Sequence, residues 1–120
     1  MIPTTPETPG ERDLRRLRTL YRALGDETRL RVIGILAEVG PMPVGELSSR
    51  VGLSQPLISW HLRILRLAGL IETTRQGREV ICRLRTAAFE DLHEAEARLI
   101  GGTSGVTAVQ DVPGTVPDVS

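Results

Sequence analysis

The sequence contains no lysine, so all 15 of its basic residues are arginines. An arginine carries a planar guanidinium whose N–H groups match phosphate and the edge of guanine, whereas a lysine carries a point charge. The basic residues are balanced by 15 acidic residues, which gives a formal net charge of zero. Total charge therefore favours no class of partner, and only the distribution of charge along the chain can indicate one.

Aromatic residues and cysteine are also scarce. Tyr21, Trp60 and Phe89 are the three aromatic residues, so the core has to be built from aliphatic side chains. Cys82 is the one cysteine, which excludes an internal disulfide and favours a reducing compartment. No apolar run is long enough to cross a membrane, and the first residues lack the basic and apolar regions of a signal peptide. We therefore expect a cytoplasmic protein without membrane contact.

Turn-forming residues divide the chain into one folded unit and two tails. Residues 1–10 are rich in Pro and Thr, residues 101–120 are rich in Gly, Pro, Ser, Thr and Val, and neither stretch has a sustained hydrophobic period. We predict disordered tails there and a single domain over residues 11–100. A small aliphatic core is marginal alone, and burying a further face against a second copy is a common remedy.

Two amphipathic helices are predicted at the start of the domain. The first covers residues 11–24, and its apolar stripe consists of Leu14, Leu17, Tyr21 and Leu24. Gly25 ends this helix, and Asp26 is placed to cap the next one. The second helix covers residues 27–38, and its predicted core face consists of Leu30, Ile33 and Ala37.

A second pair of helices, joined by a tight turn, is predicted next. The breaker "GPMP" precedes a short helix that carries Val44, Leu47 and Val51 on one side. Gly52 and Leu53 form the turn, and Ser54 is placed to cap a fourth helix that ends near Gly69.

The hydrophobic period then changes from that of a helix to that of a strand. Residues 70–74, 75–78 and 79–84 are typical of a strand, a glycine turn and a strand. A last amphipathic helix follows over residues 86–100, apolar at Ala88, Leu92, Ala95 and Leu99. The predicted fold is mainly α with a small β-hairpin wing, which is a winged helix-turn-helix.

From Ala23 to Leu84 the sequence resembles the ArsR family of bacterial winged-helix transcriptional repressors. The resemblance is carried by "ALGDETRLRVIGIL", then "PVGELSSRVGLSQPLISWHLRILRLAGLI", then "RQGREVICRL", in order and with family-like spacing. It covers about half the chain. The resemblance implies a homodimer that is joined through its first and last helices, binds operator DNA and often responds to an inducer.

The fourth helix divides into an aliphatic side and a polar side at about 100° per residue. The aliphatic side consists of Leu57, Ile58, Leu62, Ile64, Leu65 and Ala68. The polar side consists of Gln55, Pro56, Ser59, Arg63 and Arg66, with Trp60 at its edge.

In a helix-turn-helix the outer side of the second helix enters the major groove. We therefore expect Gln55 to pair with adenine and Arg63 with guanine, while Ser54 and Ser59 are placed for phosphate or sugar. A merely solvated polar face is the alternative. The turn before the helix and the hairpin after it favour DNA contact.

The hairpin adds positive charge beside this helix. Between Ser54 and Arg85, six arginines stand against two glutamates, which leaves a local balance of plus four. The last helix is acidic, so the neutral chain has a basic region and an acidic end. We predict that Arg75, Gln76 and Arg78 contact the DNA backbone or the minor groove, with solvent-facing charges as the alternative.

Trp60 and His61 lie next to each other on the fourth helix but suggest different roles. Trp60 falls outside the aliphatic side, and contact with DNA and contact with a neighbouring helix both remain open. His61 falls in the middle of the aliphatic side, and we interpret it as a packed histidine bonded to the backbone rather than a ligand.

The sequence offers little for a sensor site. Many ArsR-family proteins hold a metal through cysteines of the third helix, and Pro43 and Gly45 stand where those cysteines would be. Asp91 and His93 resemble half of a metal site in the last helix, without the other half. We predict no metal or other cofactor and interpret Cys82 as a small hydrophobic residue. The sequence does not indicate an inducer.

We predict a homodimeric repressor that binds a pseudo-palindromic operator on double-stranded DNA. A metal-responsive repressor using Asp91 and His93 is one alternative, and a winged helix that serves only as a protein-interaction module is another. An enzyme is not expected, because no paired carboxylates, nucleophile with a base, or phosphate loop occurs in a plausible setting.

Overall fold

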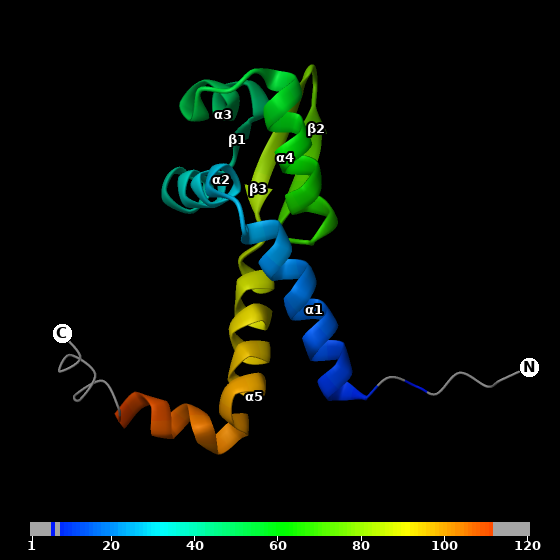
Figure 1. The fold of residues 1–120 in the computed structure, drawn as a ribbon. Coiled ribbons are helices and arrows are strands. Elements are labelled where there is room, and N and C mark those ends of the chain that lie inside the picture. Colours follow the sequence, from blue (N-terminus) through cyan, green and yellow to red (C-terminus); the bar gives the residue numbers. More distant parts are fainter. Residues whose placement is uncertain (1–5, 7, 112–120) are drawn as a thin grey trace, which may run out of the picture.

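The computed structural model of the chain describes residue 6 and residues 8–111, with side chains as far as Gly101. The rest of the predicted tails, residues 1–5, 7 and 112–120, lie outside the described residues. The described elements are α1 (Pro9–Leu24), α2 (Glu27–Val39), β1 (Met42–Pro43), α3 (Val44–Val51), α4 (Gln55–Leu67), β2 (Ile71–Gln76), β3 (Glu79–Leu84) and α5 (Thr86–Asp111). In Figure 1 the helices α2, α3 and α4 form a body with the sheet, and α1 and α5 extend from one end of it. The predicted winged helix-turn-helix is confirmed.

The first and last helices are longer than the sequence predicts. α1 begins at Pro9, and Thr8 forms a capping box with Glu11. The Thr8 N–H donates to the Glu11 carboxylate at 2.8 Å, and the Glu11 N–H donates to the Thr8 hydroxyl at 3.1 Å. Hydrogen bonding to the Glu11 carboxylate, by the Thr8 backbone first and by the Thr8 side chain second, lowers the pKa of Glu11. α5 runs to Asp111, past the predicted boundary at residue 100.

The buried faces of the first two helices are rotated from the predicted ones. α1 buries Leu17, Leu20 and Ala23. α2 buries Arg29, Val32 and Leu36. The predictions that Leu14, Tyr21, Leu30 and Ala37 face the core are wrong, because all four are exposed. α1 carries apolar residues on two sides, and a buried arginine interrupts the apolar side of α2.

The predicted cap and turn of the helix-turn-helix are confirmed. Asp26 precedes α2, and its Oδ1 accepts the N–H of Arg29 at 3.1 Å. Gly52 ends α3 in the left-handed region with φ +83°, which only glycine adopts at low cost. The Ser48 hydroxyl donates to the carbonyl of Leu53 and closes the turn. Ser54 occupies the N-cap position of α4, although its side chain makes no capping hydrogen bond.

The sheet has one strand more than the predicted hairpin. Its three antiparallel strands lie in the order β1-β3-β2, and Met42 and Pro43 of β1 stand opposite Cys82 and Ile81. β1 could not be predicted, because two residues are too few to show the alternating hydrophobic period of a strand. Pro43 is tolerated there because an edge strand does not need every N–H for pairing. The hairpin turn consists of Gly77 and Arg78 alone, because Gln76 pairs with Glu79, and Gly77 has φ +62°.

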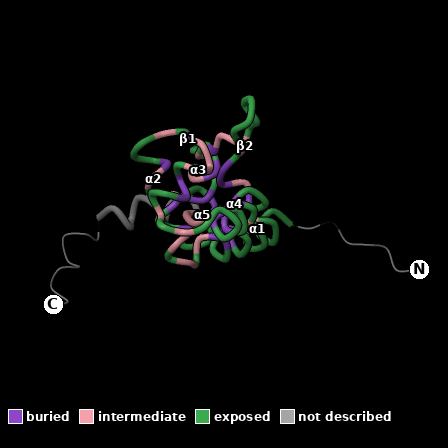
Figure 2. The backbone as a smooth tube through the Cα atoms, turned by 90° about the horizontal axis from the view of Figure 1, so that it is seen from above, coloured by how far each residue is buried: buried purple, intermediate pink, exposed green. Residues whose placement is uncertain are grey.

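The core lies where the helices α1 to α5 meet the sheet, with Ala88, Leu92 and Ala95 contributed by α5, and Figure 2 shows the buried segments there and the exposed hairpin outside it. Two polar contacts also join α5 to α1. The Tyr21 hydroxyl donates to Glu96 at 2.6 Å, and Arg98 donates twice to Asp13, at 2.7 and 3.0 Å. No helix among the described residues combines the length and apolarity that a membrane span needs.

Candidate nucleic-acid interface

α4 presents three different sides, where the sequence indicated two. Its buried residues are Ile58, His61, Leu62 and Leu65. Its exposed polar residues are Gln55, Ser59, Arg63 and Arg66. A third, apolar side is exposed at Leu57, Trp60 and Leu67, which are 42%, 58% and 71% exposed. The assignment of Leu57 to the buried side is therefore wrong. The residues that pack α4 against the core lie on another side of the helix, so the exposed polar side is available to a partner.

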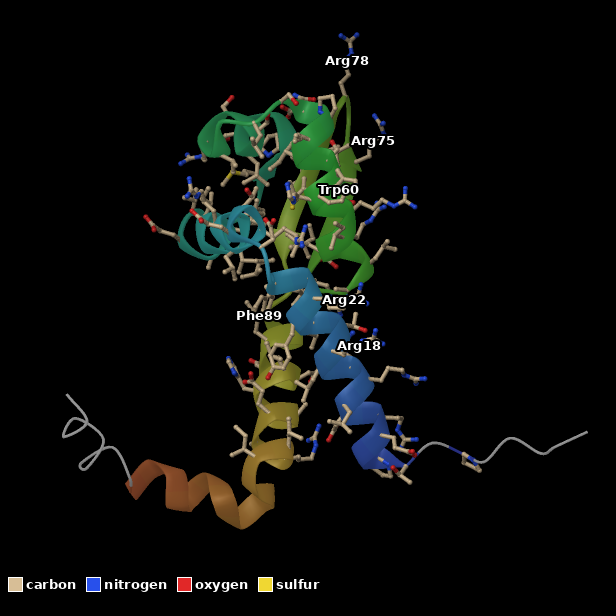
Figure 3. The ribbon with its side chains drawn as sticks, viewed as in Figure 1. Arg18, Arg22, Trp60, Arg75, Arg78 and Phe89 are labelled. Atoms are coloured by element: carbon tan, nitrogen blue, oxygen red, sulfur yellow. The ribbon has the colours of Figure 1, made fainter. Side chains whose placement is uncertain are left out.

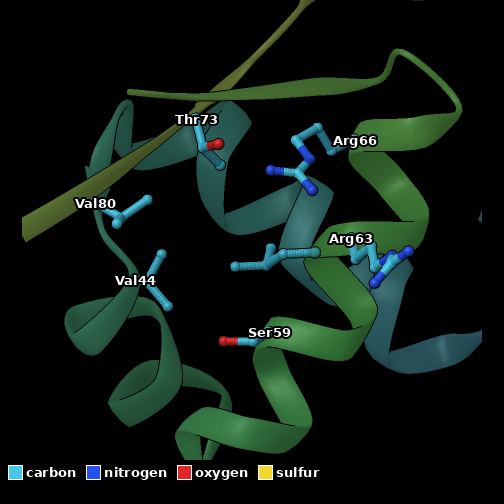
Figure 4. Close-up of a pocket in the computed structure, with 7 residues that line it drawn as sticks. Val44, Ser59, Arg63, Arg66, Thr73 and Val80 are labelled. Atoms are coloured by element: carbon cyan, nitrogen blue, oxygen red, sulfur yellow. The ribbon is translucent and has the colours of Figure 1, made fainter. Parts of the chain in front are cut away.

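A groove lies between the polar side of α4 and the hairpin. Two adjoining hollows of about 260 and 340 Å³ share Val44, Ser59 and Val80 in their walls. Arg63 and Arg66 also line the first, and Gln55 and Arg78 the second. Figure 4 shows the Ser59 hydroxyl pointing across the groove and the Arg66 guanidinium reaching toward the hairpin. The groove thus has arginines on both of its walls, and Glu79 of the hairpin lines it as well.

The remaining predicted contact residues lie at the two ends of this region. Ser54 and Pro56 are exposed at the start of α4. Arg75, Gln76 and Arg78 are exposed on the hairpin, and Figure 3 shows Arg78 at its tip. All ten predicted contact residues are exposed, and Trp60 alone lies on the apolar side of α4 rather than the polar one.

Two arginines of α4 and two near the tip of the hairpin form no ion pair with a carboxylate among the described residues. Among the described residues, none forms an ion pair with Arg63, Arg66, Arg75 or Arg78. By contrast, Arg83 on the neighbouring strand lies 3.8 Å from Glu72. The four free guanidiniums can therefore meet phosphate without first breaking an ion pair.

The side chain of Gln55 rests against the first turn of α3. A Cβ atom added at Gly45 would lie 3.2 Å from Nε2 of Gln55. This distance is shorter than an ordinary van der Waals contact, so the missing side chain of Gly45 makes room for the amide. A side chain at this position would therefore displace the Gln55 amide by a few tenths of an ångström.

His61 is buried as predicted, but its partner is a side chain and not the backbone. It is 8% exposed, and its Nδ1 lies 3.2 Å from Nη1 of Arg29 and 3.9 Å from Oδ1 of Asp26. The Trp60 ring stands edge-on to His61 at 4.9 Å, and the Arg29 guanidinium lies 5.9 Å from the Trp60 ring centre. The sequence did not indicate Arg29, because an arginine is rarely buried.

The candidate metal ligands are dispersed. His93 Nδ1 lies 3.2 Å from Glu96 Oε1, and Asp91 is exposed on the same helix. The described residues hold no group of three or more His, Cys, Asp or Glu side chains placed to share an ion. Cys82 is buried in β3, and burial raises the pKa of its thiol to about 11.

Comparison with known proteins places this geometry among bacterial regulators. A family model described as "Bacterial regulatory protein, arsR family" matches residues 26–73. The arsenical resistance operon repressor of Escherichia coli (strain K12) is 43% identical over 65 residues, which span 54% of this chain and 56% of that protein. The biofilm growth-associated repressor of Xylella fastidiosa (strain Temecula1) is 31% identical over 94 residues, 78% of this chain and 82% of the repressor.

Solved structures resemble the whole winged helix. Reduced HlyU from Vibrio cholerae is 33% identical, with a TM-score of 0.61, over 76% of this chain and 95% of that chain. A homodimeric winged helix-turn-helix domain from Mycobacterium bovis, titled a possible ArsR-family regulator, is 25% identical with a TM-score of 0.61. That match covers 92% of this chain and 93% of the domain.

Proposed function

Because the chain belongs to the ArsR family of bacterial regulatory proteins, we propose that it is a homodimeric transcriptional repressor that binds operator DNA. The observation that carries the proposal is the exposed polar side of α4 beside a groove, with two arginines of α4 and two of the hairpin that form no ion pair among the described residues. Two relatives named as repressors support the assignment. We propose that the protein acts in the cytoplasm, where a bacterial operator lies, and we assign no catalytic reaction to it.

The start of α4 enters the major groove in the proposed complex, as the second helix of this motif does. Gln55 then pairs with adenine and Arg63 with guanine, each through two hydrogen bonds. Ser54 and Ser59 contact phosphate or sugar, Pro56 packs near the backbone at the first turn, and Trp60 borders the contact.

The hairpin lies along the neighbouring backbone. Arg66 from the groove and Arg75, Gln76 and Arg78 from the hairpin contact phosphates or the minor groove. These contacts position the protein on the duplex, while the two base-reading residues of α4 carry the sequence preference.

The second copy packs on α1 and α5 in the proposed dimer. Leu14 and Tyr21 on α1, and Leu99 and Ile100 on α5, are exposed large hydrophobic residues. An apolar surface of this kind is typical of a protein interface, and the similar Mycobacterium bovis domain is homodimeric. A two-fold dimer presents two α4 helices, which requires half-sites about one helical turn apart.

The test is selection of duplexes from a random pool, followed by binding of Arg63→Ala. We expect the wild-type chain to select a pseudo-palindrome. Arg63→Ala should lose about 1–3 kcal/mol of discrimination at one base pair of each half-site, because one bidentate contact is removed. Arg31→Ala is the matched control, since Arg31 is an exposed arginine of α2 paired with Glu27. Selection of no sequence would refute sequence-specific repression and favour the protein-interaction alternative.

A further inference from the structure

Arg29 lies at the junction of α1, α2 and α4. Arg29 is only 9% exposed, although its guanidinium is always charged. Nε donates to the carbonyl of Ala23 at 2.6 Å, and Nη2 donates to that of Arg22 at 3.5 Å. These carbonyls belong to the last turn of α1 and have no partner within their own helix. Arg29 therefore caps the C-terminal end of α1, where the helix dipole also favours a cation.

The third contact of Arg29 is with α4. Its Nη1 lies 3.2 Å from Nδ1 of the buried His61. A guanidinium can only donate, so His61 accepts through an unprotonated Nδ1. Trp60 packs beside both partners, with its ring 4.9 Å from His61 and 5.9 Å from the guanidinium carbon. One buried cation thus bonds the end of α1 to the middle of α4.

α1 holds α4 at a second point. Nη1 of Arg16 donates to the carbonyl of Ala68 at 3.2 Å, at the C-terminal end of α4. Contacts at the middle and at the end of a helix restrict both its rotation and its tilt. The orientation of α4 is therefore set relative to α1 by two arginines, of which Arg29 is the buried one.

We propose that Arg29 is a positioning residue that fixes the orientation of α4 through His61. The packing of α1 then determines how Gln55, Ser59 and Arg63 are presented. This inference rests on the proposed function, in which α1 lies in the dimer interface and α4 contacts DNA. Arg29 is the link that makes the geometry of the dimer and the geometry of base reading depend on each other.

Three variants of the full chain test the link. His61→Leu removes the acceptor at similar volume and leaves a buried donor of Arg29 without a partner. His61→Asn keeps an acceptor near the position of Nδ1 and is the conservative control. Arg29→Met with His61→Leu makes both partners apolar and removes the unpaired buried charge, but it also removes the cap on the carbonyls of Ala23 and Arg22, so only part of the stability should return. Each variant is measured for urea unfolding, amide exchange in α4, and binding to the duplex selected by the wild-type chain and to a scrambled duplex.

We expect His61→Leu to unfold at lower urea and to bind the selected duplex about tenfold more weakly, with the scrambled duplex unchanged. His61→Asn should behave as the wild type. The double variant should regain part of the stability that His61→Leu loses but not the preference for the selected duplex, and its α4 amides should still exchange faster than those of the wild type. Recovery of both preference and exchange together with stability would show that the pair only stabilises the fold, and would overturn the proposal.

The two proposals can fail separately. Absence of any preference in the wild-type chain would refute the proposed function, because that result does not depend on Arg29. Amide exchange is measured without DNA and still decides whether the pair holds α4. Equal exchange of α4 in the wild type and the double variant would refute the link even if the chain selects an operator.

Discussion

Arg78 lies in the turn of the β2–β3 hairpin, exposed and without a carboxylate partner among the described residues, so its removal should weaken the salt dependence of DNA binding. Each phosphate that a protein neutralises adds about 0.9 to the slope of log affinity against log salt concentration. A dimer carries two copies of Arg78, so Arg78→Ala should reduce the slope by about 1.8. Between about 50 and 200 mM salt, that reduction corresponds to about a tenfold smaller loss of affinity.

Fluorescence anisotropy with a labelled duplex over this salt range measures the slope directly. Arg31→Ala removes the same charge from the exposed outer side of α2 and should leave the slope unchanged, because Arg31 pairs with Glu27 and not with DNA. The scrambled duplex should show the same reduction, since phosphates carry no sequence. If Arg78→Ala retains the wild-type slope, then the hairpin does not contact phosphate, and its positive charge serves only solubility.

Two further predictions follow from the packing of single residues. Gly45→Ala places a Cβ 3.2 Å from Nε2 of Gln55, so the amide must shift and discrimination at the base that Gln55 reads should fall in binding assays. The urea midpoint should not fall, because alanine is favoured over glycine in a helix by about 0.5–1 kcal/mol; a lower midpoint with intact discrimination would contradict this. Cys82 has a thiol pKa raised to about 11, so iodoacetamide should label it far more slowly in the folded chain than in urea, as followed by mass spectrometry. Equal labelling rates would show that β3 opens readily.

The helix-turn-helix and the hairpin could be predicted because glycine and capping residues fix them locally. Asp26 caps α2, Gly52 adopts the left-handed conformation after α3, and Gly77 forms the hairpin turn, as their neighbours in the sequence indicated. These signals act over three or four residues. They depend little on what the rest of the chain does.

The buried faces of α1 and α2 could not be predicted in the same way, since hydropathy does not say which apolar residue faces its own core. Leu14 and Tyr21 have the period of a core stripe but are exposed, and Leu20 takes their place inside. Arg29 is buried only because the carbonyls of α1 and the ring of His61 surround it. A contact between residues that are 32 positions apart has no local signature.

Because every basic residue is an arginine, and arginines also make internal hydrogen bonds, the number of positive charges is a poor guide to the interface. Six arginines and two glutamates between Ser54 and Arg85 indicated a local charge balance of plus four. Two of them are engaged elsewhere: Arg85 donates to the carbonyl of Gly69 at 3.1 Å, and Arg83 lies 3.8 Å from Glu72. The guanidinium fork allows such internal roles because it donates to several acceptors at once. The other four arginines are Arg63, Arg66, Arg75 and Arg78. The structure thus identifies which arginines of the basic region form the candidate interface.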